Sequence, residues 1–256
     1  MLRIRLALAF LFAGTAWGAA PSYSAAGIVH IGDYAGGPFA PNSILVVFGQ
    51  DLARSAQSMV SGDIKGGFLP LELNSTRVYV DNSAVPLFYV APTQVNFMLP
   101  ARIDGKQAVV RVVREGWTGP EVAIPIVEAA PALFSTSSGY AIATHADNSL
   151  VTPEAPARAG EVIVIWATGL GRTTKNPTTG EILPYLSPLL NPESLKVTLG
   201  PVTVDAGRIR YAGLTPLSAG LYQINVELPA IPEADPEIRV ACGAQASAGG
   251  LKLAAR

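Results

Sequence analysis

The chain has 256 residues, with 18 basic and 19 acidic side chains, and its charged fraction of 14% is well below the roughly 25% of an average globular protein. No cluster of Lys and Arg is interleaved with aromatic residues, which argues against nucleic-acid binding, since phosphate backbones are held by concentrated positive charge. The 25 glycines and 21 prolines instead predict many short strands joined by turns.

The first 18 residues have the features of a secretory signal peptide. Arg3 and Arg5 supply positive charge, an apolar run follows over residues 6–13, and Ala16 and Gly18 offer small side chains at the two positions that signal peptidase reads. The apolar run is short for a membrane anchor, and no later segment is apolar enough to cross a bilayer. We expect an exported protein, periplasmic or secreted, that is cleaved before Ala19 and has no membrane span afterwards.

Short apolar segments bounded by Gly, Pro, Asn and Asp follow along the rest of the chain, which is the rhythm of a β-sandwich or barrel. In the first half the predicted strands are 27–31, 44–49, 76–80, 85–89, 95–99, 108–114 and 122–127. In the second half they are 140–144, 162–168, 195–199, 208–211, 222–228, 237–241 and 251–254. No later segment sustains the apolar period of a helix over three turns.

The second half repeats the plan of the first. The segment SILVVFGQDL at 43–52 is answered by EVIVIWATGL at 161–170, and QVNFMLPA at 94–101 is answered by QINVELPA at 223–230. Two matched segments in the same order predict two tandem copies of one β-rich module, because a period this long exceeds that of a solenoid repeat. The continuously apolar strands at the start of each module are expected to lie centrally in their sheets.

These observations predict an all-β protein with two tandem β-rich domains, each a sandwich or a barrel, after a signal peptide. The predicted bounds are 1–18 for the signal peptide, 24–130 for the first domain and 131–256 for the second. The boundary is set where proline interrupts the strand pattern at 129–131. The linker is short, so the two modules are expected to be in contact.

Two amide pairs occupy the same place in the two modules: Gln94 with Asn96, and Gln223 with Asn225. Side chains at i and i+2 point to the same side of a strand, so these amides could recognise a sugar or a peptide edge. They could also satisfy backbone groups of neighbouring loops, and their presence in both modules fits that structural role. We keep all four as candidate ligand contacts beside this alternative.

His145 and Asp147 complete the set of candidate contacts. They lie with Asn148 and Ser149 in one short stretch, which predicts a hairpin turn, because the members of a catalytic triad normally come from separate elements. Neither histidine has a second one nearby, so no metal site and no cofactor are expected. Cys242, the only cysteine, is predicted to be a buried and inert thiol.

The longest segments without strand character are residues 56–67 and 173–190, at matching places in the two modules. Because loops carry function more often than strands do, a binding surface is expected there.

Several motifs, in this order, resemble the Solibacter-type uncharacterised C-terminal domain family of exported bacterial proteins: PNSILVVFG at 41–49, YVAPTQVN at 89–96, PALF at 131–134, WATGLG at 166–171, and YAGL at 211–214 followed by GLYQIN at 220–225. The resemblance runs from about residue 26 to the C-terminus. It implies tandem immunoglobulin-like sandwiches, no known activity and no catalytic residues that can be transferred. Asn42 stands where the family usually has Gly.

The sequence therefore favours a non-enzymatic exported binding or adhesion protein of the envelope or the extracellular space. It would contact a polysaccharide or another exported protein through loops or a sheet edge. The alternative is a structural spacer or assembly module for an exported partner. A third hypothesis is a hydrolase with a site between the modules that uses His145 with Asp147 or Glu154. The sequence leaves the oligomeric state open.

Overall fold

The structure is a computed structural model that describes residues 19–231 and 233–256. The predicted signal peptide, residues 1–18, lies outside the described residues. Strands and turns make up the described chain, with short 3₁₀ turns η1 (Ser61–Asp63), η2 (Pro192–Ser194) and η3 (Ala206–Arg208). The predicted all-β sandwich fold is confirmed. Among the described residues, no helix has the length and apolar character needed to cross a bilayer.

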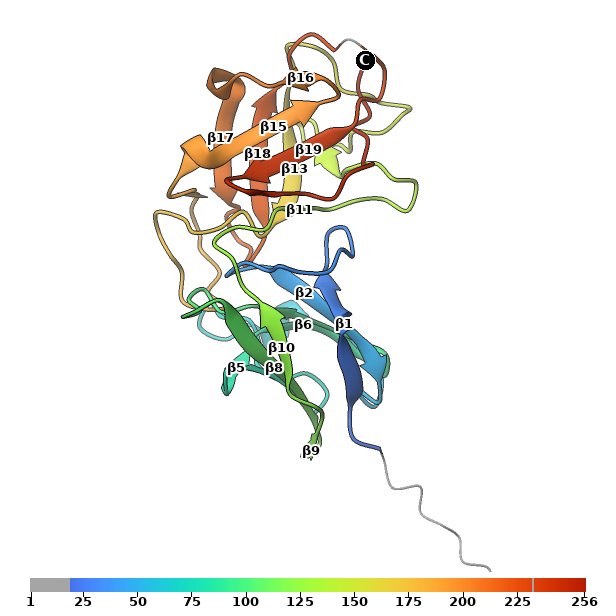
Figure 1. The fold of residues 1–256 in the computed structure, drawn as a ribbon, viewed down its shortest axis with the longest axis vertical. Coiled ribbons are helices and arrows are strands. Elements are labelled where there is room, and N and C mark those ends of the chain that lie inside the picture. The colour runs from blue at the N-terminus through green and yellow to red at the C-terminus, as the bar shows by residue number, and fades with distance from the viewer. Residues whose placement is uncertain (1–18, 232) are drawn as a thin grey trace, which may run out of the picture.

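The N-terminal half packs two antiparallel sheets around one core (Figure 1). One sheet has the order β1-β2-β7-β6-β3 and the other β10-β8-β4-β5, with β9 added to β8. The buried side chains alternate along these strands and meet between the sheets, as Leu45, Val78, Phe97 and Val110 illustrate. The strands of this half are β1 (Ser22–His30), β2 (Ile44–Gln50), β3 (Gln57–Ser58), β4 (Thr76–Val80), β5 (Ser83–Val85), β6 (Leu87–Ala91), β7 (Gln94–Met98), β8 (Gln107–Arg114), β9 (Trp117–Thr118) and β10 (Val122–Pro125).

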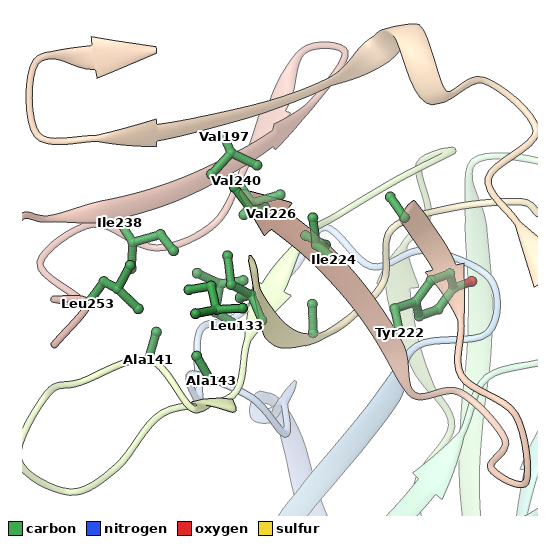
Figure 2. Close-up of a cluster of buried hydrophobic side chains, with 14 of the residues drawn as sticks. Leu133, Ala141, Ala143, Val197, Tyr222, Ile224, Val226, Ile238, Val240 and Leu253 are labelled. Carbon is green, nitrogen blue, oxygen red and sulfur yellow. The ribbon is translucent and has the colours of Figure 1, made fainter. Parts of the chain in front are cut away.

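The C-terminal half has its own core between a sheet of order β11-β13-β18-β17-β14, with β12 added to β13, and a sheet of order β16-β15-β19-β20. Figure 2 shows Ile224 and Val226 of β18 in this core with Val197 of β15 and Val240 of β19. The strands of this half are β11 (Ala132–Leu133), β12 (Ala143–Thr144), β13 (Val162–Thr168), β14 (Ser187–Pro188), β15 (Leu195–Leu199), β16 (Val202–Thr203), β17 (Ile209–Leu214), β18 (Tyr222–Glu227), β19 (Ile238–Cys242) and β20 (Gln245–Ala246).

The strand orders repeat between the halves, as the sequence repeat predicts. The run β2-β7-β6-β3 corresponds to β13-β18-β17-β14, and β8-β4-β5 corresponds to β19-β15-β16. Both apolar first strands, β2 and β13, lie inside their sheets with partners on either side. The place of β1 is taken in the C-terminal half by the two short strands β11 and β12.

Three predicted strands differ from the structure. The predicted strand 85–89 is divided at Pro86 into β5 and β6, which belong to different sheets, because proline has no N–H to continue a ladder. The predicted strand 251–254 forms only isolated bridges and single bonds, such as Ile238 N–H to Leu251 O at 2.8 Å. Of the predicted strand 140–144, only β12 is regular.

A hairpin between β4 and β5 forms as the turn chemistry predicts. Asp81 and Asn82 occupy the turn with φ of 48° and 66°, values that Asp and Asn tolerate better than most residues. The register sets Val80 opposite Ser83, and Val78 and Val80 are both buried on the core face.

The two halves are joined by buried polar contacts. The hydroxyl of Thr168 accepts a hydrogen bond from Ile44 N–H at 3.0 Å and donates one to Gly220 O at 3.0 Å. Gly169 has φ of 76°, and a Cβ there would lie 2.3 Å from Ala130 O, so no larger residue fits without movement. The predicted contact between the modules is confirmed.

Asn42 also lies in this junction, fully buried and with φ of 64°. Gly adopts this left-handed conformation without a steric penalty, and Asn is among the other residues that tolerate it best.

Candidate functional site

The first candidate amide pair lies on the outer face of β7. Val95 and Phe97 point into the core and are fully buried, so Gln94 and Asn96 face outward, where both are half-buried. The Gln94 amide donates from Nε2 to Asn96 Oδ1 at 2.8 Å. Each amide therefore fixes the orientation of the other. Backbone groups of a loop, the partners expected in the structural alternative, receive no hydrogen bond from either side chain in the described part of the chain.

Aromatic side chains flank this amide pair in register. Phe48 of β2 stands opposite Gln94, and Tyr89 of β6 stands opposite Asn96. Tyr34, from the turn after β1, packs against Phe48 with ring centroids 6.0 Å apart. Tyr34 is 58% exposed and Phe48 is 39% exposed. We call these five residues the aromatic–amide face.

The same pattern recurs in the C-terminal half. Gln223 donates from Nε2 to Asn225 Oδ1 at 3.0 Å, and both side chains are half-buried on the outer face of β18. Trp166 stands opposite Gln223, and Tyr211 stands opposite Asn225. We call these four residues the C-terminal counterpart of the face.

Neighbouring residues form more hydrogen bonds with the side chains of the C-terminal counterpart than with those of the aromatic–amide face. Thr215 donates its hydroxyl to Gln223 Oε1 at 2.9 Å, and the Tyr211 hydroxyl donates to Leu214 O at 2.8 Å. Burial raises the pKa of Tyr211 to about 12. On β18, the strand of the amide pair, Glu227 forms ion pairs with Arg208 and Arg210.

Two polar groups on the aromatic–amide face are left open. Asn96 Nδ2 remains a donor and Gln94 Oε1 remains an acceptor, and no other residue in the described ranges hydrogen-bonds to either. A sugar hydroxyl can serve both, since it donates and accepts. The exposed rings of Phe48 and Tyr34 beside these amides offer an apolar surface on which the C–H face of a sugar ring can pack.

His145 is held inside the C-terminal half by both ring nitrogens. Its Nδ1 forms a short hydrogen bond with Glu161 Oε1, and its Nε2 lies 3.1 Å from Ala155 O. The hydrogen bond with Glu161 raises the pKa of His145, an effect that partial burial opposes. Because both ring nitrogens are hydrogen-bonded, the imidazole links two turns and has a structural role.

Asp147 closes the predicted hairpin turn. Its Oδ1 accepts from Ser149 N–H at 2.9 Å and from the Ser149 hydroxyl at 2.6 Å, and these bonds lower the pKa of Asp147. Asn148 takes φ of 67° in the same turn. The turn prediction is confirmed.

The pairing that a hydrolase would need is replaced by other contacts. Within the described residues, no hydrogen bond joins His145 to Asp147 or to Glu154, and the partner of His145 is Glu161. The described residues also contain no group of three or more His, Cys, Asp or Glu placed to hold a metal ion. Cys242 is buried, as predicted, and burial raises the pKa of its thiol to about 12.

The two long loops that were expected to bind a ligand instead meet each other. Leu69 N–H donates to Gly180 O at 3.0 Å, and Ile182 N–H donates to Gly67 O at 2.8 Å. Beneath them Leu69, Met98 and Ala219 form a small buried cluster. The paired parts of the loops lie between the halves, and the expected binding surface on these loops stays a prediction.

Sequence reasoning missed the aromatic members of the face. Phe48 ends the apolar run of β2, and its spacing of two from Val46 placed it on the outer face. Tyr34 carries no strand signal, and it reaches the face only because the turn after β1 folds back, with Tyr34 N–H bonded to His30 O at 3.1 Å.

No family model matches the chain, and no curated protein matches it. Membership of the Solibacter-type family stays a prediction. Among solved structures, the chain is similar to the surface glycan-binding protein PbSGBP-B from Prevotella bryantii, with 12% identity and a TM-score of 0.28, over 90% of this chain and 41% of that one. It is also similar to domains 5–6 of the S-layer protein SbsC, with 9% identity and a TM-score of 0.27, over 91% and 97% of the two chains.

Proposed function

We propose that this protein is an exported, non-enzymatic binding protein that holds a polysaccharide against the aromatic–amide face of its N-terminal half. The observation that carries the proposal is the register that sets Phe48 beside Gln94 and Tyr89 beside Asn96. Phe48 is exposed and Tyr89 is half-buried, and each ring stands next to an amide that has an open polar group. An apolar ring surface next to a donor and an acceptor matches a sugar, which has an apolar C–H face and hydroxyls at its edge.

The support for a polymer as ligand is the openness of this surface. The face is the outer side of a sheet of five strands, β1-β2-β7-β6-β3, and its aromatic members come from a turn and two separate strands. A polysaccharide chain can lie across such a surface and repeat the same weak contact along its length. Repeated contacts raise the apparent affinity through effective concentration.

The support for rigidity of the face comes from the bond between its amides. The hydrogen bond from Gln94 to Asn96 holds both side chains before any ligand arrives. Preorganised groups lose less conformational entropy on binding, which favours affinity.

Affinity electrophoresis in gels that contain one soluble polysaccharide each tests the proposal. At least one glycan is expected to retard the mature protein. Phe48→Ala is expected to weaken binding about two- to tenfold, since an aromatic contact contributes roughly 0.5–1.5 kcal/mol. Gln94→Ala is expected to weaken it as well, by removing an acceptor and freeing Asn96.

Trp117→Ala is the matched control, because Trp117 of β9 is 41% exposed and lies outside the face. Retardation that is lost equally in Phe48→Ala and Trp117→Ala, or that persists in a Tyr34, Phe48 and Gln94 triple alanine variant, would contradict the proposal.

A second candidate function, a structural spacer or assembly module, is supported by the joined halves. Thr168, Gly169 and the paired loops fix one half against the other without a flexible linker between them. A spacer is expected to co-purify with an exported partner from its native cells and to show no glycan binding. A single affinity purification from periplasmic and medium fractions, with and without Phe48→Ala, separates the two functions. Amino-terminal sequencing of the recovered protein tests export, with Ala19 as the expected first residue.

A further inference from the structure

The edge of β17 is open over part of its length. Its outer neighbour β14 pairs only with Gly213 and Leu214, and one further bond joins Leu189 N–H to Ala212 O at 2.9 Å. In the described chain, no segment pairs with the outer side of Ile209–Tyr211. A free edge presents backbone donors and acceptors that another strand can use.

The equivalent edge in the N-terminal half is closed by the chain itself. Strand β3 sets Ser58 opposite Tyr89 of β6, and Met59 N–H donates to Phe88 O at 2.9 Å. Tyr89 and Tyr211 are equivalent, since each stands opposite the asparagine of its amide pair. The register of both strands shifts at the residue before this tyrosine, which is Phe88 in β6 and Arg210 in β17. In the N-terminal half the segment that begins with β3 therefore pairs with β6 as far as its register shift. In the C-terminal half β14 ends before it reaches the register shift of β17.

The chain leaves the edge of β17 for a clear reason. After β14, Leu190 N–H donates to Arg172 O at 2.9 Å, which turns the backbone away from β17. Pro192 then begins η2 and has no N–H of its own to donate. Between this segment and β17 a space remains in the position that β3 fills in the other half.

That space is a groove of about 420 Å³ with mostly apolar walls. Glu193 lies on its rim and forms no ion pair with any described residue, whereas Arg210 is already paired with Glu227. The groove therefore combines an apolar interior, an open strand edge and one uncompensated negative charge. Its walls include Pro192, Leu195, Ala206, Ile209 and Tyr211.

We propose that this groove receives an extended peptide segment of another exported protein, which adds to β17 as a short antiparallel strand. The peptide places an apolar side chain between Leu195 and Ile209 and a Lys or Arg next to Glu193. Main-chain bonds supply affinity and the alternate side chains supply specificity, as in other cases of strand addition. The site is separate from the aromatic–amide face and does not depend on glycan binding.

The length of the open edge favours a peptide over a second copy of this chain. The open stretch of the edge is short, Ile209–Tyr211, and offers main-chain groups to only a short segment. A stable dimer buries on the order of 800 Å² on each partner, which needs a much longer contact. The segment that closes β6, Gln57 to Met59, shows which kind of backbone satisfies such an edge.

Amide NMR of the ¹⁵N-labelled mature chain tests the proposal, with a blocked peptide that joins residues 57–60, QSMV, to a C-terminal lysine. The expected result is a set of saturable shifts at the amides of Ile209–Ala212, with a dissociation constant at or below about 1 mM. A peptide with proline in place of its methionine is expected to bind at least about tenfold more weakly, because it lacks the central N–H. No shift at these amides at about 1 mM peptide, or equal binding of the proline peptide, would overturn the proposal.

Two variants locate the site on the protein. Ala206→Trp fills the groove from an exposed position and is expected to weaken the peptide at least tenfold, whereas Thr203→Trp adds the same ring on β16 outside the groove and is expected to leave affinity unchanged. Glu193→Lys is expected to weaken the lysine peptide about two- to fivefold, as for an exposed ion pair, and Glu154→Lys serves as its control. Equal affinity of the two tryptophan variants, or a dimer of the chain that protects the β17 amides from exchange, would refute it.

Discussion

The two halves of this protein have the same internal arrangement of strands and differ in the features at their surfaces. The same strand order, the same outward amide pair and the same register shift before a tyrosine occur in both. The N-terminal half leaves two aromatic rings exposed beside its amides and closes the edge of β6 with β3. The C-terminal half bonds Gln223 of its amide pair to Thr215 and leaves the edge of β17 open. The repeated features specify the fold, and the features that differ are the ones we assign to binding.

The largest expected effect compares equivalent core positions. Phe97 and Val226 occupy the same place in β7 and β18, and both are fully buried. Phe97→Ala is expected to lower the free energy of unfolding by about 3–5 kcal/mol, and Val226→Ala by about 2 kcal/mol, because fewer buried carbons are removed. Urea unfolding of each variant measures the two losses, and equal losses would show that the two cores respond alike.

Two glycine substitutions test whether the junction between the halves is more tightly packed than an ordinary turn. Gly169→Ala forces a Cβ to within 2.3 Å of Ala130 O at φ of 76°, whereas at Gly243, with φ of 60°, a Cβ would meet nothing within 4 Å. Gly169→Ala is expected to cost about 2–4 kcal/mol, and Gly243→Ala only the backbone strain of about 1 kcal/mol. Thermal unfolding followed by circular dichroism checks the difference. Similar losses for both would mean that the halves are free to shift.

The hydroxyl that links the halves is tested by a substitution of nearly the same shape. Thr168→Val leaves Ile44 N–H and Gly220 O without their partner in a fully buried site. The expected cost is about 1–3 kcal/mol in the free energy of unfolding. Thr174→Val, at an exposed position in the loop after β13, is the control and is expected to have little effect. A neutral Thr168→Val would remove this bond from the account of the junction.

The smallest expected effects are on the pH dependence of stability. Each half contains one histidine, and the pKa values of the two histidines are shifted in opposite directions. Burial lowers the pKa of His30 below its ordinary value of 6.5, and the hydrogen bond with Glu161 raises that of His145 above it. The stabilisation from His145 is fully present below about pH 6.5 and is lost as the pH rises through its folded-state pKa. For His30 the folded state loses stability as the pH falls from about 6.5 through its lowered pKa.

Imidazole titration by NMR measures both midpoints directly. The midpoint of His145 is expected above 6.5 and that of His30 below it, while both are expected to approach about 6.5 in urea. Glu161→Gln is expected to lower the midpoint of His145 and to leave that of His30 in place. A reversed order of the two midpoints in the folded protein would contradict the hydrogen bonding described here.

Much of the fold follows from local patterns in the sequence. The central position of β2 and β13, the hairpin turn at Asp147 and Asn148, and the burial of Cys242 were all predicted from short windows, because apolar runs and turn residues act within a few positions. The division of the chain at Pro86 was missed although proline marks it, since the apolar residues on both sides read as one strand.

The site was only partly predictable, because its members are brought together by tertiary contacts. The amide pairs were found from their repetition, but their bonds to each other and their aromatic neighbours depend on the register between strands. The partner of His145 is Glu161, 16 positions away, and no local pattern indicates it. Likewise, β3 and β14 have two residues each and take their strand form from β6 and β17.

The hydrogen bonds between the paired loops do not depend on which side chains stand at the donating positions. Their two bonds, from Leu69 N–H to Gly180 O and from Ile182 N–H to Gly67 O, use main-chain groups alone. Any residue except proline can stand at positions 69 and 182 and still donate. The side chains at these two positions are therefore free to make other contacts, as Leu69 does in the buried cluster with Met98 and Ala219.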